Sequence, residues 1–184
     1  MQSPVGVWTI GHDNRDINEL AGLLCGAEIA VLVDVWAYPS SKRHPQFARS
    51  SLEIALAKSK IHYRWEGKCL GGFRKPKINS PNVALNSGGL NGYADYMHTP
   101  EFAEGISDLV GFSSKTKLAI ICAERDPLQC HRSLIADYLT ARGLSVNHIL
   151  EAGVIQTHQM NTLARVVGEN LVYDTQIQSQ FDLT

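Results

Sequence analysis

The chain has 184 residues, of which 44% are hydrophobic and 19% charged, and its formal net charge is −1. This length suits one domain with a substantial core, and the near-zero charge excludes a global basic field for nucleic acid or an anionic membrane. Because no apolar run is long enough to span a bilayer and the N-terminus lacks signal-peptide features, we expect no membrane partner. Four cysteines are too few for a disulfide scaffold, which favours reduced thiols in a cytoplasmic protein.

The first third of the chain predicts strands that alternate with helices. Short apolar runs predict strands at 5–10, 30–35 and 61–65. A helix with one apolar face follows Asp16, which is spaced from Glu19 as in a capping box. Ser50 and Glu53 repeat that spacing, which predicts a second helix that runs to about residue 60.

The middle of the chain has a less regular pattern. Residues 67–92 are rich in Gly, Asn, Ser, Pro and Lys, which predicts a long irregular connection of the kind that is functional or mobile. A helical turn is expected at 93–97. Thr99 and Pro100 have the cap-plus-proline pattern that begins a helix, here through about residue 109.

The most informative segment is the one that ends at Gly143. Residues 118–123 are an unbroken apolar run, typical of a strand that is buried on both faces of a parallel sheet. Asp126 and Pro127 predict the start of a helix, and Gly143 predicts its end.

Two further elements complete the predicted domain. A fifth strand is expected at 145–150, and the apolar spacing at 157–171 predicts a last helix. We therefore expect a single domain over residues 1–172 and a C-terminal tail of uncertain structure at 173–184.

Strands that alternate with helices predict a three-layer α/β domain, with a mostly parallel sheet of about five strands flanked by helices. Ligands bind such sheets beyond the carboxyl ends of the strands. Four polar residues fall at or just after predicted strand ends: His12, Asp34, Cys122 and Glu124. We expect them to converge on one site and to supply its catalytic groups.

Two interpretations of the cysteines remain open. Cys122 is either a small apolar core residue or a thiolate stabilised by Arg125, by Arg132 or by the following helix N-terminus. For Cys130, a role in core packing is as good an interpretation as a functional role. A metal site that combines these cysteines with His131 and His12 is conceivable but not favoured, because zinc ligands usually form close Cys-x₂₋₄-Cys pairs and these two cysteines are eight positions apart. The sequence identifies no cofactor.

Asp34 needs a partner, because an unpaired buried carboxylate is costly. It is either a structural acceptor for loop N–H groups or for Arg43, or a functional group that acts as a general base or orients His12. Arg132, at a predicted helix start, is placed to hold an anion together with Arg43. The alternative for Arg132 is an ion pair with Glu124 or Asp126, and the alternative for Arg43 is solvated loop charge.

Several short motifs resemble, in the same order, the family called domain of unknown function 488. They are Thr9–His12, Val33–Val35 with Pro39–Ser41 and Phe47, Leu70–Gly72, Tyr96–Met97, Cys122–Glu124 and Cys130–Arg132. The resemblance runs from about residue 8 to residue 150. It implies a compact α/β fold and one shared site, whose binding residues here are Ser41, Gly71, Gly72, Tyr96, Cys130, His131 and Arg132. The family commonly has arginine where this chain has Trp36.

Three functional hypotheses follow. The first is an enzyme that acts on an anionic, phosphate-bearing substrate such as a nucleotide or nucleic acid. The second is a non-catalytic module that binds a nucleotide or single-stranded nucleic acid in the same pocket. The third is a thiol redox or metal-sensing protein that uses Cys122 and Cys130.

Overall fold

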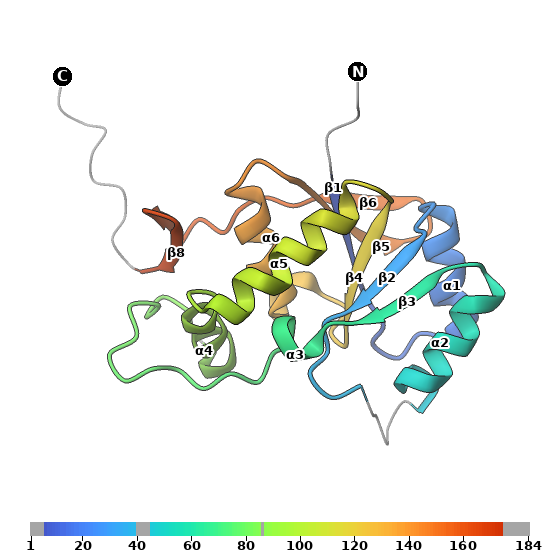
Figure 1. Cartoon of the computed structure of the whole chain (residues 1–184), viewed down its shortest axis with the longest axis horizontal. Coiled ribbons are helices and arrows are strands. Elements are labelled where there is room, and N and C mark those ends of the chain that lie inside the picture. Colours follow the sequence, from blue (N-terminus) through green and yellow to red (C-terminus); the bar gives the residue numbers. More distant parts are fainter. Residues whose placement is uncertain (1–5, 40–44, 86, 175–184) are drawn as a thin grey trace.

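The computed structural model describes residues 6–39, 45–85 and 87–174. Its centre is a six-stranded sheet with the order β3-β2-β4-β1-β5-β6, in which the first five strands are parallel and β6 is antiparallel (Figure 1). The strands are β1 (Gly6–Gly11), β2 (Val31–Asp34), β3 (His62–Trp65), β4 (Leu118–Cys122), β5 (Ser145–Glu151) and β6 (Val154–Thr157). The mostly parallel α/β fold is thus confirmed, with one strand more than the sequence predicts.

Helices cover both faces of this sheet. One face carries α1 (Ile17–Gly26) and α2 (Arg49–Lys58); the other carries α3 (Gly67–Leu70), α4 (Gly88–Tyr96), α5 (Pro100–Ser113) and α6 (Arg132–Thr140). Two short 3₁₀ turns, Pro45–Phe47 and Pro127–Gln129, complete the helical elements. Within the described residues, none of these helices has the length and apolar character that crossing a membrane requires.

The central strand β4 shows why its sequence is apolar without a break. Successive side chains of a strand point to opposite faces of the sheet, and here both faces are covered. Leu118, Ile120 and Cys122 pack on the α4–α6 side, and Ala119 and Ile121 pack on the α1–α2 side. All five are buried.

Side-chain capping sets two of the predicted helix starts. The Asp16 carboxylate accepts a hydrogen bond from Asn18 N (2.7 Å), and the Thr99 hydroxyl accepts one from Phe102 N (3.4 Å), with Pro100 in the first turn of α5. The predicted Ser50 cap is wrong. Helix α2 begins at Arg49, and Ala48 occupies the cap position without a side-chain bond.

The helix expected at Pro127 begins five residues later. Asp126 does cap, accepting from Leu128 N (2.9 Å), but it caps only a 3₁₀ turn. Cys130 then takes an extended conformation (φ −127°, ψ 146°), which turns its side chain into the core and interrupts the helix. Continuous helix starts only at Arg132.

The predicted helix at 157–171 is wrong. This segment contains the end of β6 and a separate two-stranded hairpin, β7 (Ala164–Val167) with β8 (Asn170–Tyr173). Its apolar spacing does not mark a buried face, because Leu163 and Val167 are both about two-fifths exposed. Gly168, with φ +60°, makes the tight turn between the strands that a helix would not allow.

A buried polar chain attaches this C-terminal part to the sheet. Tyr173 donates its hydroxyl to Asp137 Oδ2 (2.8 Å), and Asp137 Oδ1 accepts from His158 Nε2 (2.8 Å). His158 Nδ1 lies 2.9 Å from His148 Nε2, and His148 Nδ1 lies 2.7 Å from the Thr9 hydroxyl. One consistent set of donors satisfies every member when both rings are neutral, so the chain connects β1, β5, α6 and β8.

The chain predicts a pH-dependent stability. Burial, together with the charges of His158 and Arg132, lowers the pKa of His148 to about 4. An unfolded histidine has a pKa of about 6.5, so His148 contributes stability above about pH 6.5 that is lost as the pH falls toward 4. We expect His148→Gln to reduce the dependence of unfolding free energy on pH in this window by up to about 1.4 kcal/mol per pH unit. Urea titrations at pH 7, 6, 5 and 4 measure it. The exposed His62→Gln is the control, and equal slopes for His148→Gln and the parent would contradict the assignment.

Candidate functional site

The carboxyl ends of β1, β2 and β4 lie side by side, as the sequence predicts. His12 N donates to Cys122 O (3.0 Å), and Val35 N donates to Ile121 O (3.1 Å). The three strand ends therefore meet within hydrogen-bonding distance at one edge of the sheet.

The pleat divides the side chains at this edge into two clusters. His12 lies on the α1–α2 side, where its ring stacks on Phe47 (centroids 4.2 Å apart) and meets Trp36 at 5.6 Å. Asp34 faces the same side. Cys122 faces the α4–α6 side. The sequence places all three residues at one edge but does not separate them by face.

Asp34 is held by two donors. It accepts from Trp36 N (2.8 Å) and from the Tyr63 hydroxyl (2.6 Å). Burial raises its pKa to about 6, while the hydrogen bonds from Tyr63 and Trp36 and the charge of Arg49 oppose that rise. Its contacts are those of an acceptor that fixes the turn after β2.

The α4–α6 side holds a compact group of two thiols and an imidazole. His131 Nδ1 lies 3.8 Å from Cys122 Sγ and 3.7 Å from Cys130 Sγ, and the three donor atoms all lie within 4.8 Å of one another. His131 Nε2 lies 3.1 Å from Val35 O. Because a carbonyl only accepts, Nε2 carries the proton, and the Nδ1 lone pair faces both sulfurs.

The walls of this group are built from backbone that approaches closely. A Cβ on Gly72 would lie 3.0 Å from His131 Nδ1, so only glycine leaves the ring undisturbed at this position. A Cβ on Gly71 would lie 2.2 Å from Gly67 O. The Tyr93 ring packs against His131 with centroids 4.8 Å apart. Tyr96, one turn further along α4, donates its hydroxyl to Cys69 O (2.8 Å).

The two thiols differ in acidity. A hydrogen bond from Cys122 and the charge of Arg132 lower the pKa of Cys130 well below its ordinary value. The same bond and burial raise the pKa of Cys122. Both cysteines are free thiols. Of the two, Cys130 is therefore the more acidic thiol.

Arg132 is among the most deeply buried side chains of the protein, at 1% exposure. Its guanidinium donates to the carbonyls of Ile10 (3.1 Å), Glu124 (2.6 Å) and Arg125 (2.8 Å). In the described part of the chain it forms no ion pair, and its buried Nε has no acceptor. The side chain thus points inward and holds the β4–α6 loop.

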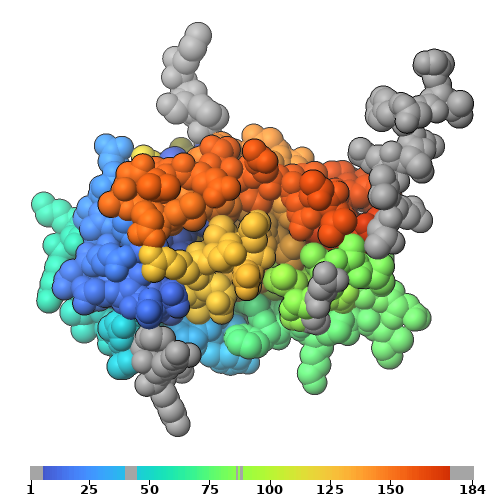
Figure 2. Space-filling model, turned by 180° about the vertical axis from the view of Figure 1, so that it is seen from behind, coloured from blue at the N-terminus to red at the C-terminus, as the bar shows by residue number. Residues whose placement is uncertain are grey.

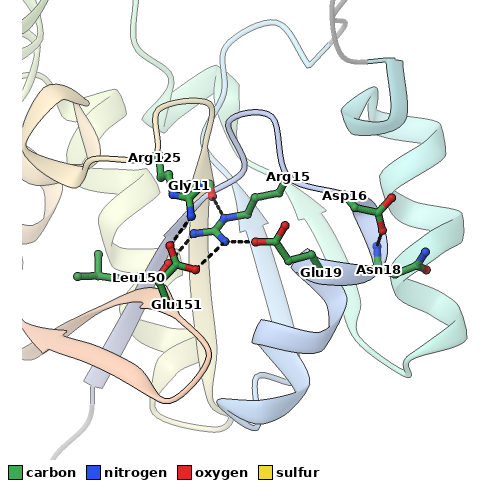
Figure 3. Close-up of polar contacts among 8 residues, drawn as sticks. All are labelled: Gly11, Arg15, Asp16, Asn18, Glu19, Arg125, Leu150 and Glu151. Carbon is green, nitrogen blue, oxygen red and sulfur yellow. Dashed lines mark hydrogen bonds and ion pairs between the residues drawn. The ribbon is translucent and has the colours of Figure 1, made fainter.

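A second buried arginine, Arg15, also donates hydrogen bonds to backbone carbonyls at this edge of the sheet. Arg15, 2% exposed, donates to the carbonyls of Gly11 (3.1 Å) and Leu150 (2.5 Å) and pairs with Glu19 and Glu151 (Figure 3). Arg125 also pairs with Glu151. Sequence reasoning missed Arg15, since nothing distinguishes it from a surface arginine before a helix cap.

The remaining predicted residues lie in other surroundings. Glu124 is exposed, and its part in the site is the carbonyl that accepts from Arg132. Ser41 and Arg43 lie outside the described residues. Trp36, at the position of the family's usual arginine, is half-buried beside His12.

A cavity of about 730 Å³ lies at the carboxyl end of β5, on the face where the β5–β6 hairpin borders the β4–α6 loop (Figure 2). His148, His158 and Asp137 line it, together with Ser133 and Glu151. The sequence analysis did not find this cavity, because three of those residues lie in segments without a recognisable motif. The polar side-chain atoms of His148, His158 and Asp137 are already engaged in the hydrogen-bonded chain that ends at Tyr173.

Arg132→Lys should destabilise the fold. The Arg132 guanidinium donates to three backbone carbonyls, whereas lysine offers a single ammonium group. At least one buried carbonyl therefore loses its hydrogen-bond donor. We expect a loss of about 2–4 kcal/mol in the free energy of unfolding, measured by urea denaturation. The matched control is Arg142→Lys in the exposed turn after α6, which we expect to cost less than about 1 kcal/mol. A similar small cost for both variants would show that the carbonyl contacts of Arg132 are dispensable.

The comparisons agree with the resemblance seen in the sequence motifs. The model of the family described as Domain of unknown function DUF488 matches residues 16–139, a range that contains Asp34, Cys122, Cys130 and His131. No curated protein and no solved structure gives a significant match. On the extent of the family match, the chain belongs to the DUF488 family.

Proposed function

We propose that the protein binds a thiophilic divalent cation such as Zn²⁺ through Cys122, Cys130 and His131, and uses it in catalysis. The observation that carries the proposal is the convergence of three buried donor atoms within 4.8 Å of one another. Thiolate and imidazole are ligand types that zinc prefers.

The distances suit such an ion. Zinc–sulfur bonds of about 2.3 Å and zinc–nitrogen bonds of about 2.0–2.1 Å at a tetrahedral angle place sulfur and nitrogen roughly 3.5 Å apart. The two Sγ–Nδ1 distances of 3.8 and 3.7 Å exceed this by only a few tenths of an ångström. Small side-chain rotations of Cys122 and Cys130 would close the difference.

The surroundings of His131 also support the proposal. Metal-bound histidines usually donate their other ring N–H to a carboxylate or a backbone carbonyl, which fixes the tautomer and the ring plane. Val35 O accepts that bond here, while Gly72 and Tyr93 confine the ring on both sides. The imidazole therefore presents its lone pair without reorganisation.

Charge favours an anionic ligand in the fourth position. Three protein ligands are the usual number at catalytic zinc sites, where water or substrate completes the coordination and the ion acts as a Lewis acid. Two thiolates balance a divalent cation, and the buried Arg132 guanidinium adds one positive charge near both sulfurs. Hydroxide or an anionic substrate group would balance that charge. This reasoning supports an enzyme for anionic substrates.

A second candidate function uses the thiols directly. The lowered pKa of Cys130 is the property of a nucleophilic or redox-active cysteine, and Cys122 lies beside it in the position of a resolving thiol. In this alternative, Cys130 reacts with an electrophilic substrate and no ion occupies the group.

Metal content distinguishes the two candidates. We expect the untagged protein to hold about one equivalent of Zn²⁺ by elemental analysis, and Cys130→Ser to lose most of it because a hydroxyl is a poor zinc ligand. The exposed Cys25→Ser is the matched control and should retain the ion. Circular dichroism checks that each variant is folded.

The contrary result is equally clear. If Cys130→Ser and Cys25→Ser bind the same amount of Zn²⁺, the group is not the metal site. If, in addition, iodoacetamide modifies Cys130 rapidly and added Zn²⁺ does not slow the reaction, the thiol candidate replaces the metal candidate.

A further inference from the structure

We infer that Tyr38 and Phe73 form a stacking platform for a nucleobase, so that the substrate is a nucleotide, either free or within a single strand. The inference rests on the proposed function in one respect: it names the substrate class of the same site. Its own evidence is the exposure, backbone conformation and position of two aromatic side chains.

Both rings lie in solvent. Phe73 is 77% exposed and Tyr38 is 70% exposed, and their centroids are 6.3 Å apart with an angle of 44° between the ring planes. They come from different loops, one after β2 and the other after α3. Two large exposed aromatic side chains in contact gain little for folding, but they present faces on which a base can stack.

The backbone of Phe73 is strained. Its φ of +60° lies in the left-handed region, which costs an aromatic residue roughly 1–2 kcal/mol. Glycine would avoid this cost, and the side chain gains no burial in return. Backbone strain that is not compensated by burial of the side chain is typical of functional positions.

The loop that carries Phe73 is nevertheless fixed. The Arg74 guanidinium stacks on the Tyr96 ring, with its carbon 3.8 Å from the ring centroid. It also donates to Gly71 O (3.1 Å) and Lys68 O (2.9 Å). These contacts hold the turn on both sides of Phe73, so the ring is directed outward by a preorganised loop.

The platform borders the proposed metal ligands. Gly72, the neighbour of Phe73, packs against His131, and Gly71 packs against Ala37, the neighbour of Tyr38. A base stacked on the platform would therefore lie against the same loop that packs on the thiol–imidazole group. The motif residues Gly71 and Gly72 serve both features, since each lets the loop approach closely.

The charge around the platform suits phosphate. Lys68, Lys75 and Lys77 are exposed on the same segment. The nearby carboxylates are engaged, because Glu66 pairs with Arg64 and Asp95 is buried among other donors. Ring stacking beside exposed lysines favours a nucleotide over an uncharged sugar, which would use the aromatic faces alone.

Equilibrium binding tests the inference. The probes are AMP, a fluorescein-labelled single-stranded dT₁₂, the corresponding duplex and a neutral oligosaccharide. We expect AMP or dT₁₂ to bind more tightly than the duplex and the oligosaccharide, and a weaker affinity at higher salt for dT₁₂. Phe73→Ala should weaken binding about five- to hundred-fold, as expected for the loss of one stacked base.

Two further variants keep the test decisive. Phe73→Trp should retain affinity because it keeps a stacking face. Ile78→Ala, 94% exposed on the same segment, is the matched control and should bind as the parent does. Equal affinity of Phe73→Ala and the parent, or no nucleotide binding in the parent, would overturn the inference; preference for the duplex or the oligosaccharide would overturn it as well.

The metal-depleted Cys130→Ser variant separates this inference from the proposed function. If it binds nucleotide with the same dependence on Phe73, the platform exists whatever the thiol–imidazole group does. If the parent contains Zn²⁺ but Phe73→Ala binds as the parent does, the metal site stands and the platform fails.

Discussion

The buried guanidinium of Arg132 is the interaction on which the carboxyl edge of the sheet depends. It donates hydrogen bonds to the carbonyls of Ile10, Glu124 and Arg125, which belong to the end of β1 and to the loop after β4. A buried cation is costly unless charge-assisted hydrogen bonds compensate it, and here three carbonyls do so. This arrangement fixes the loop that carries Cys130 and His131. It also leaves a positive charge near two thiols, which lowers the free energy of their deprotonated forms.

The same edge shows how one sheet can separate two sets of polar residues. The pleat places His12 and Asp34 on the α1–α2 side, where aromatic packing and two hydrogen bonds occupy them. It places Cys122 on the other side, where Cys130 and His131 meet it. The first set stabilises the turn after β2. The second set retains lone pairs that its neighbours do not use, which is why the functional argument concentrates there.

Much of the fold could be predicted from the sequence, because periodicity and capping are local. The apolar run of β4, the Thr99 cap and the mostly parallel sheet all follow from short patterns. The hairpin β7–β8 could not, since Leu163 and Val167 have helical spacing but remain partly exposed, and their burial depends on distant packing. The sequence placed Cys122, Cys130 and His131 in one candidate site but did not favour them as metal ligands. Eight positions separate the cysteines in sequence, and the extended backbone at Cys130 is what turns its side chain toward the group.

X-ray absorption spectroscopy of the zinc-loaded protein tests the central claim most directly, because it reports the atoms bound to the ion. The account predicts two sulfur ligands at about 2.3 Å and nitrogen or oxygen ligands at about 2.0–2.1 Å in a four-coordinate site. Cys122→Ser should reduce the sulfur count to one. A spectrum with nitrogen and oxygen ligands alone, or one that Cys122→Ser leaves unchanged, would contradict the assignment of Cys122, Cys130 and His131 as the metal site.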